Sequence, residues 1–378
     1  MKRLIPVAKP SLTEAEIRAM ARVVRSGWIT QGPEVEQFEK EFATFVGAPH
    51  AVATSSATTG LSLALELIGV GTGDEVIVPS FTFIASVNVI IHTGATAVFA
   101  DIEERTFNVD PTDVAKKVTN KTRAILFVDQ FGLPADIDRL KRIAKDHSIS
   151  IIEDAACALG STYKGKRIGR VSPISVFSFH PRKLLTTGDG GMLVATDPKL
   201  AKRAKVLRNQ GMSISDLERH SSKKIIFEHY DEAGYNFRLT DVAAAMGRVQ
   251  LQRFGAMLER RQKQAHRYDS MLTDVPHLGI PYVPHYAKPN YQSYVVTLEA
   301  DAPLSRDDLM AKLLKKGIAT RRGAMAIHLE PYYKKKFTSL SLPLTEKAAK
   351  TTIVLPLYHD MTTKDQNYVA SSIRTLLE

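Results

Sequence analysis

The stretch AILFVDQFGLPADIDRLKRIAKDHSISIIE, residues 124–153, decides the fold class of this chain. It begins with the apolar run 124–128 and ends with the run 150–153, and both are typical of buried β-strands. Between them, residues 135–147 carry apolar side chains at helical spacing. A strand, a helix and a second strand in this order predict two parallel strands joined by a covering helix, as in α/β domains.

Similar apolar runs on both sides of this unit extend the prediction to a mostly parallel sheet that is buried on both faces. A long helix is expected from about residue 239 to 267, followed by a strand at 294–298 and helices at 306–316 and from about 363. We expect a large cofactor-binding domain over residues 1–250 and a small α+β domain over residues 251–378. The other apolar runs of the large domain are 51–53, 75–79, 97–101, 176–178 and 191–194.

The composition is that of an ordinary globular protein. Its 378 residues include 51 Lys+Arg and 40 Asp+Glu, which gives a formal net charge of +11. The basic residues are scattered among acids and no DNA- or RNA-binding motif is present, so we expect no nucleic-acid partner. A single cysteine excludes a disulfide framework, and the histidines form no HExxH pair, so no metal site is expected. No apolar run reaches the length of a membrane span or of a signal peptide, so the sequence predicts a cytoplasmic protein without a membrane partner.

Ligands of open α/β sheets bind beyond the carboxyl ends of the strands, so polar residues just after strands are the first candidates for chemistry. Lys183 lies in SFHPRKLLTTGDGG (residues 178–191), which is too polar and glycine-rich for a core. A lysine in a partly desolvated cleft can form a Schiff base, although most loop lysines are surface residues. The GxGxxG and GxxxxGK[ST] patterns are absent, so the glycines do not predict a nucleotide loop.

Three further positions allow both a structural and a chemical role. Asp154 ends an apolar strand and is either a helix N-cap or the partner of a protonated ring nitrogen. Ser56-Ala57-Thr58 lies at a strand-to-helix turn, where free N–H groups hold phosphate, although capping alone also explains Ser and Thr there. Cys157 on its own is expected to be a small buried apolar side chain rather than a nucleophile.

Together these motifs resemble the DegT/StrS family of pyridoxal-phosphate-dependent sugar aminotransferases. The similarity runs from about residue 5 to the C-terminus, and several blocks in order make it specific where one alone would be weak. It implies an aspartate aminotransferase-like (fold type I) α/β protein with a mostly parallel seven-stranded sheet and a smaller C-terminal domain. The blocks are SFHPRKLLTTGDGG around Lys183, IEDAACALG around Asp154, GYNFRLTDVAAAMG around Asn236, SGWITQGPEVEQFEKEF (26–42), VATSSATTGLSLAL (52–65), GDEVIVPSFTFIAS (73–86) and LPLTEKAAKTTIVLPLYHDMT (342–362).

The resemblance assigns a role to each matching position. Lys183 corresponds to the lysine that forms the Schiff base with pyridoxal 5'-phosphate and moves the proton between substrate and cofactor. Asp154 corresponds to the acid that keeps the pyridinium nitrogen protonated. Phe83 corresponds to the aromatic residue that stacks on the ring, and Cys157 stands where glutamine or histidine is usual. The phosphate cup is expected from Ala57, Thr58 and Ser178, with Asn236 reaching it from the neighbouring subunit of a homodimer with shared active sites; Thr30, Arg238 and His328 are candidates for the substrate.

The resemblance implies an enzyme that moves an amino group from glutamate (or glutamine) to a keto-sugar, with a nucleotide-linked 4-keto or 3-keto deoxysugar expected. Arg238, Arg321 and Arg322 suit a diphosphate, although each also suits a structural ion pair. The alternatives are a pyridoxal-phosphate-dependent sugar dehydratase, which Lys183 argues against, and a non-catalytic cofactor-binding regulator on the same fold. Asp129 is a further departure, because histidine is frequent there in the family.

Overall fold

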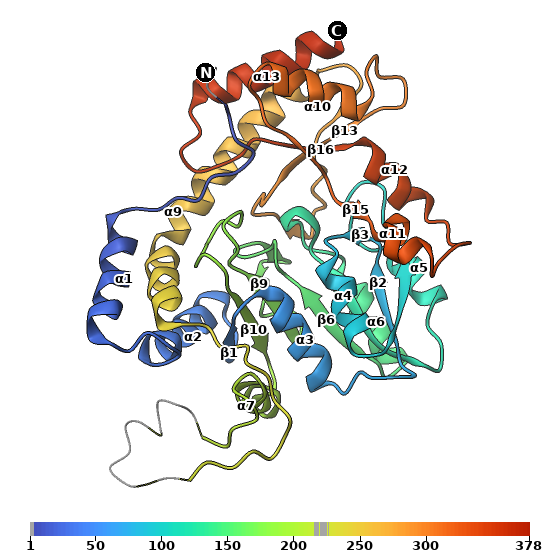
Figure 1. The fold of residues 1–378 in the computed structure, drawn as a ribbon. Coiled ribbons are helices and arrows are strands. Elements are labelled where there is room, and N and C mark those ends of the chain that lie inside the picture. Colours follow the sequence, from blue (N-terminus) through green and yellow to red (C-terminus); the bar gives the residue numbers. More distant parts are fainter. Residues whose placement is uncertain (1–3, 215–218, 220–224, 226) are drawn as a thin grey trace.

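The large sheet has seven strands, and four of its six neighbouring pairs are parallel. The computed structural model describes residues 4–214, 219, 225 and 227–378 (Figure 1). The strand order is β1-β10-β9-β6-β5-β2-β4, with β10 antiparallel to both of its neighbours and the remaining pairs parallel. The strands are β1 (His50–Thr54), β2 (Glu75–Pro79), β4 (Thr96–Ala100), β5 (Thr122–Val128), β6 (Ser150–Asp154), β9 (Ile174–Ser178) and β10 (Gly191–Ala195).

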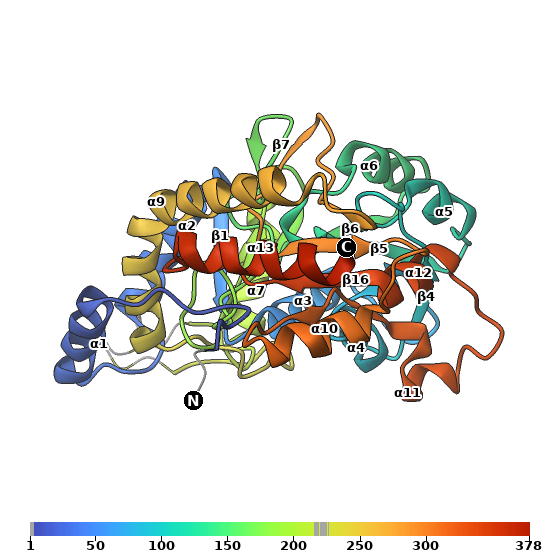
Figure 2. The same cartoon turned by 90° about the horizontal axis from the view of Figure 1, so that it is seen from above.

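Helices cover both faces of this sheet, as strands that are apolar on both sides require. One apolar core packs α3, α4 and α7 on one face, and a second core packs α2, α6 and α9 on the other. Figures 1 and 2 show the sheet between these two layers. The predicted mostly parallel α/β architecture of fold type I is confirmed. The helices are α1 (Glu14–Ser26), α2 (Pro33–Val46), α3 (Ala57–Leu67), α4 (Ala85–His92), α5 (Pro111–Lys116), α6 (Ile137–Asp146), α7 (Pro198–Leu207) and α9 (Asp241–Leu272).

The C-terminal part builds a separate sheet with its own apolar core. Its order is β11-β13-β16-β14, and α10 and α13 pack on it together with the C-terminal half of α9. The N-terminal segment joins this core, because Ile5 is buried there and its N–H donates to the Gly317 carbonyl at 2.8 Å. The elements are β11 (Leu278–Gly279), β13 (Tyr294–Leu298), α10 (Arg306–Lys315), β14 (Arg321–Arg322), α12 (Pro343–Thr351), β16 (Thr352–Leu355) and α13 (Thr363–Leu377).

Short elements connect the two sheets. Helix α9 runs continuously from the large sheet to the C-terminal core (Figure 1), so the boundary expected at residue 250 falls inside a helix and stays a prediction. The short elements are β3 (Phe81–Thr82), η1 (Gln130–Gly132), β7 (Thr162–Tyr163), β8 (Lys166–Arg167), β12 (Ala287–Lys288), β15 (Met325–Ala326), η2 (Ile327–Leu329) and α11 (Pro331–Lys334).

None of the helices in the described part of the chain combines the length and apolarity needed to cross a membrane.

The first residue of α9 holds the start of α2 in place. The Asp241 carboxylate is buried and accepts hydrogen bonds from the backbone N–H groups of Gly32, Glu34 and Val35 at 2.7, 3.1 and 3.0 Å. These groups have no partner within α2, because the first turn of a helix leaves its N–H groups unpaired. One carboxylate therefore caps a helix that lies more than 200 residues earlier in the chain.

We expect Asp241→Ala to lower the free energy of unfolding by about 2–4 kcal/mol, because three buried N–H groups lose a charged acceptor. Chemical denaturation followed by circular dichroism measures the loss. Asp231→Ala, which removes an exposed acid from the segment before α9, is the matched control and should stay within about 0.5 kcal/mol of the wild type. Equal stability of the two variants would contradict the capping role.

Candidate active site

One open cleft lies at the carboxyl ends of the parallel strands, between the large sheet and the C-terminal sheet. It encloses about 1590 Å³ including the solvent at its mouth. Its walls come from the turn before α3, the ends of β5, β6 and β9, and the segments 321–325 and 354–357 of the C-terminal part. This is where an open α/β sheet is expected to bind its ligand. The predicted site residues that line the cleft are Ala57, Thr58, Phe83, Asp154, Cys157, Ser178 and Lys183.

Asp154 places a buried carboxylate at the floor of this cleft. It is the last residue of β6 and is 5% exposed. The Ser86 hydroxyl donates to its Oδ2 at 2.7 Å, and the Ala156 N–H donates to its Oδ1 at 3.1 Å. Burial raises the pKa of Asp154, while the Ser86 hydrogen bond, the Ala156 N–H and the positive charge of Lys183 oppose this. The alternative of a helix N-cap is wrong, because β6 is followed by turns rather than by a helix.

Lys183 reaches the same cleft from the loop after β9. Its side chain is half-buried, and its Nζ donates to the Cys157 Sγ at 3.0 Å. The loop is closed locally by the Lys183 N–H, which donates to the His180 carbonyl at 2.8 Å. Cys157 is only half-buried and its thiol faces an amine, so it is not the enclosed apolar side chain that its residue type alone predicts.

The turn before α3 presents N–H groups to the cleft. Ser56 is the N-cap of α3 and accepts from the Thr59 N–H at 3.1 Å, so capping explains this serine. Ala57 and Thr58 are the first two residues of the helix, whose N–H groups have no intrahelical acceptor. Gly191 permits this arrangement, because a Cβ there would lie 2.5 Å from the Ser56 carbonyl. Ser178 also lines the cleft, and its hydroxyl together with these N–H groups suits the binding of an anion.

An exposed aromatic side chain completes the wall. Phe83 is 58% exposed and follows β3, although a phenylalanine gains free energy when it is buried. Its ring is therefore available to pack against a ligand in the cleft.

Four of the predicted residues lie outside the cleft of their own chain, namely Thr30, Asn236, Arg238 and His328. Thr30 and Asn236 are exposed, and the Asn236 Oδ1 accepts from the Arg238 Nε at 3.1 Å. Arg238 also donates to the Asn209 Oδ1 at 3.1 Å. An exposed asparagine outside its own cleft agrees with the expectation that it serves a neighbouring subunit, and this expectation stays a prediction.

His328 is placed differently from what its block suggests. It is 1% exposed, its Nδ1 lies 2.7 Å from the Ser80 Oγ, and its Nε2 lies 3.4 Å from the Glu346 Oε1. Burial lowers its pKa, although Glu346 opposes this shift. Both ring nitrogens face protein partners, and His328 does not line the cleft. We therefore no longer expect His328 to contact the sugar. His328 instead holds η2 against the loop after β2.

Several residues in the cleft wall or behind it were not singled out from the sequence. Ser86 is 68 residues from Asp154 along the chain, and only the tertiary structure brings its hydroxyl to the carboxylate. It belongs to the block GDEVIVPSFTFIAS, which is the one signal that the sequence offered. Arg182, next to Lys183, lines the cleft together with Arg321 and Arg322, which the sequence analysis named. The cleft is also lined by Gln130, Phe131, Asp189 and Gln292.

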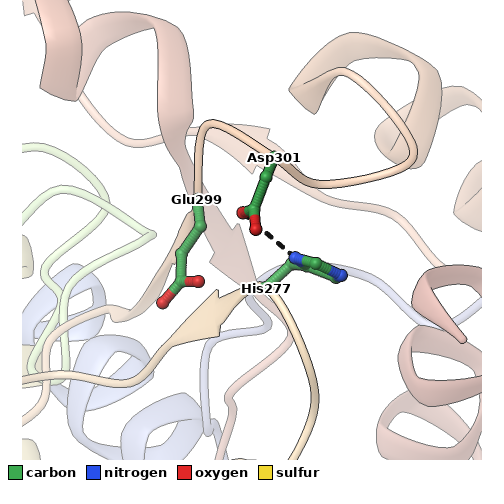
Figure 3. Close-up of side chains that lie close together, drawn as sticks. All are labelled: His277, Glu299 and Asp301. Atoms are coloured by element: carbon green, nitrogen blue, oxygen red, sulfur yellow. Dashed lines mark ion pairs between the residues drawn. The ribbon is translucent and has the colours of Figure 1, made fainter.

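A group of three side chains with metal-binding atoms lies away from the cleft, near the β11–β13 edge of the C-terminal sheet (Figure 3). His277 and Asp301 form an ion pair at 3.1 Å, with Glu299 beside them. Both acids are exposed. An exposed ion pair explains this arrangement without a metal, because such pairs are common on protein surfaces.

The cleft meets the chemical demands of a phosphorylated pyridine aldehyde. It offers an amine, amide donors at a helix start, an exposed ring face and a buried carboxylate that forms no ion pair with any arginine or lysine among the described residues. The sheet is mostly parallel, has seven strands and carries these groups at its carboxyl edge. These features define a fold type I enzyme of the class that depends on pyridoxal phosphate.

The chain belongs to the DegT/DnrJ/EryC1/StrS aminotransferase family, whose model matches residues 10–374. It is a pyridoxal-phosphate-dependent aminotransferase. It is 38% identical to the spore coat polysaccharide biosynthesis protein SpsC of Bacillus subtilis (strain 168), over 99% of this chain and 97% of that protein. Among solved structures, S. venezuelae DesV is 36% identical with a TM-score of 0.90, covering 100% of this chain and 99% of that one. Spr1654 from Streptococcus pneumoniae in its PLP form is 30% identical with a TM-score of 0.91, covering 99% and 98%.

Proposed function

We propose that this enzyme takes an amino group from L-glutamate or L-glutamine and delivers it to a nucleotide-linked 4-keto or 3-keto deoxysugar. The observation that carries the proposal is one cleft that holds Lys183 and Asp154 and is also lined by Arg182, Arg321 and Arg322. A guanidinium group can bind two phosphate oxygens at once, which suits the diphosphate of a nucleotide sugar. The similarity to SpsC, a polysaccharide biosynthesis protein, supports a sugar as the acceptor.

Two side chains would carry the proton chemistry. Pyridoxal phosphate, when bound, supplies the carbonyl group that carries nitrogen and the ring that accepts electrons. Lys183 provides an amine that can bond to this carbonyl and then move a proton at the substrate carbon. Asp154 holds a proton at the ring nitrogen, because a buried carboxylate stabilises a positive charge beside it.

The remaining cleft residues would bind and orient. The N–H groups of Ala57 and Thr58 and the hydroxyl of Ser178 bind the phosphate, and Phe83 packs on one face of the ring. Cys157, whose Sγ lies 3.0 Å from the Lys183 Nζ, holds this amine in the cleft when no ligand engages it.

We also propose a homodimer in which each site borrows residues from the other subunit. Asn236, Thr30 and Arg238 lie outside the cleft of their own chain, and large apolar side chains are exposed in the same part of the molecule. Such apolar exposure is typical of an interface. The side chains are Ile29, Phe227, Tyr230 and Tyr235.

The half-reaction with the donor tests the proposal. We expect L-glutamate or L-glutamine to abolish the visible absorption of the protein loaded with pyridoxal phosphate and to release the matching 2-keto acid without any acceptor. L-Aspartate serves as the control donor, and a panel of nucleotide-linked keto-sugars then identifies the acceptor by restoring the absorption. A loaded protein that neither donor changes would instead favour the dehydratase or the non-catalytic regulator.

A further inference from the structure

Two carboxyl groups that the proposed function does not use are buried together beneath the floor of the cleft. Asp129 follows β5 and Glu153 is the fourth residue of β6, and each is 0% exposed. Strands β5 and β6 are parallel neighbours, with Phe127 opposite Glu153 and Val128 opposite Asp154. Glu153 therefore points to the face of the sheet opposite to Asp154, because successive side chains of a strand alternate.

The hydrogen bonds of these two groups leave one oxygen of each without a donor. The Ala135 N–H donates to the Asp129 Oδ1 at 3.0 Å, and the Ser175 hydroxyl donates to the Glu153 Oε2. Asp129 Oδ2 and Glu153 Oε1 are buried and have no protein donor. The Ser172 hydroxyl and the Gly169 N–H also face Glu153, but neither reaches Oε1 at hydrogen-bond distance. Asp129 lies next to Glu153 on the same face of the sheet, because the Asp129 N–H continues the pairing of β5 with β6 and side chains alternate along each strand.

Two carboxylates in such contact cannot both be ionised away from water. Within the described residues, no basic side chain forms an ion pair with either acid, and the charged groups that face Asp129 are the acids Glu153 and Asp154. Burial raises the pKa of Asp129 well above its usual range and that of Glu153 to about 7. One proton between the two unpaired oxygens would satisfy both of them, because a protonated carboxyl group donates and a carboxylate accepts.

We infer that Asp129 and Glu153 share one proton between their two unpaired oxygens, and that this pair positions the floor of the active site. Asp129 ties the loop down at both ends: its N–H donates to the Asp154 carbonyl at 3.2 Å, and its carboxyl accepts from Ala135. The loop between them contributes Gln130 and Phe131 to the cleft wall. Asp129 is a positioning residue, because it touches the wall and Asp154 rather than the reacting atoms.

The shared proton also protects the charge of Asp154. With one proton on the pair, one of its two carboxyl groups is neutral, so the pair carries one negative charge near Asp154 instead of two. A second negative charge would favour protonation of Asp154, because like charges raise the pKa of a carboxyl group. This consequence rests on the proposed role of Asp154, whereas proton sharing itself is independent of that role.

Asp129→Asn is the sharpest test, because the amide supplies a permanent N–H donor in place of the shared proton and keeps the acceptor for Ala135. The folded wild type retains a proton that the unfolded chain gives up, so its stability falls as pH rises from the unfolded carboxyl values to the pKa of the folded pair. Asp129→Asn lacks this loss. We expect its unfolding equilibrium constant to fall relative to that of the wild type, by up to tenfold per pH unit, between about pH 5 and the pKa of the pair.

The measurement is denaturant unfolding of the cofactor-free protein across pH, with Asp146→Asn on the surface of α6 as the matched control. A pH-independent difference between Asp129→Asn and the wild type would overturn proton sharing. Glu153→Gln should remove the same pH dependence of the unfolding equilibrium, because it replaces the other carboxyl group of the pair with an amide. Failure of both amide variants to fold would also overturn it, because an amide can make the proposed hydrogen bond.

The positioning role has a separate readout in the loaded enzyme. We expect Asp129→Ala to lower kcat by about 10- to 100-fold and Asp129→Asn to restore it to within about threefold, since the conservative variant keeps the loop bonds. Equal loss in both variants would overturn the positioning role. A missing response of the wild type to any amino donor would instead count against the proposed function, while the stability test would stand.

Discussion

Replacing Lys183 with alanine is expected to lower amino transfer by at least about 10³-fold while the protein remains folded. The variant removes the amine that bonds to the cofactor and moves the proton. Within the described residues, the hydrogen bond of this half-buried side chain is the one to the Cys157 thiol. Release of keto acid from the amino donor measures the rate. A second readout is the intact mass after borohydride reduction, which should rise by one cofactor in the wild type and stay unchanged in Lys183→Ala.

Lys183→Arg separates the amine from the positive charge. Arginine keeps the charge near Asp154 but offers no nucleophilic amine, because guanidinium is not deprotonated in proteins. We expect it to be as inactive as Lys183→Ala. Transfer at a wild-type rate by either variant would mean that another group does this chemistry, and the assignment of the cleft would fail.

Replacing Asp154 with asparagine is expected to lower the rate by about 10²- to 10³-fold, the usual effect of removing one electrostatic group from a preorganised site. Asparagine keeps an acceptor oxygen for the Ala156 N–H, and its amide NH2 can donate to the Ser86 Oγ, so the local structure should persist. It carries no charge, and it cannot hold a proton at the ring nitrogen. Borohydride should still fix the cofactor to Lys183, which separates this variant from those at Lys183.

Ser86→Ala is the graded control for Asp154. It removes the 2.7 Å hydrogen bond that opposes the raised pKa of Asp154, so a larger fraction of the carboxyl group is protonated at a given pH. Activity should therefore fall less than in Asp154→Asn and recover partly as pH rises. A wild-type rate in Asp154→Asn would mean that Asp154 has only a structural role in the turn after β6.

The α/β class and the positions of the strands were predictable from the sequence, because both depend on local patterns. Each apolar run of the large domain is observed as a strand, and α6 is observed at 137–146 where a helix was expected over 135–147. Lys183 and Asp154 were also predicted from local signals, because Asp154 ends a strand, Lys183 lies in the loop after another strand, and ligands bind at that edge of the sheet. The resemblance of several ordered blocks added the cofactor and the family.

Only the tertiary structure decided what packs against these residues. It showed that β10 runs antiparallel within the sheet, that Ser86 reaches Asp154 and that Asp241 caps α2. It also removed His328 from the substrate candidates and joined Asp129 to Glu153 in a buried pair. The physical reason is common to all of these. Periodicity and strand ends are properties of neighbouring residues, whereas burial and hydrogen-bond partners depend on segments that meet only when the whole chain has packed.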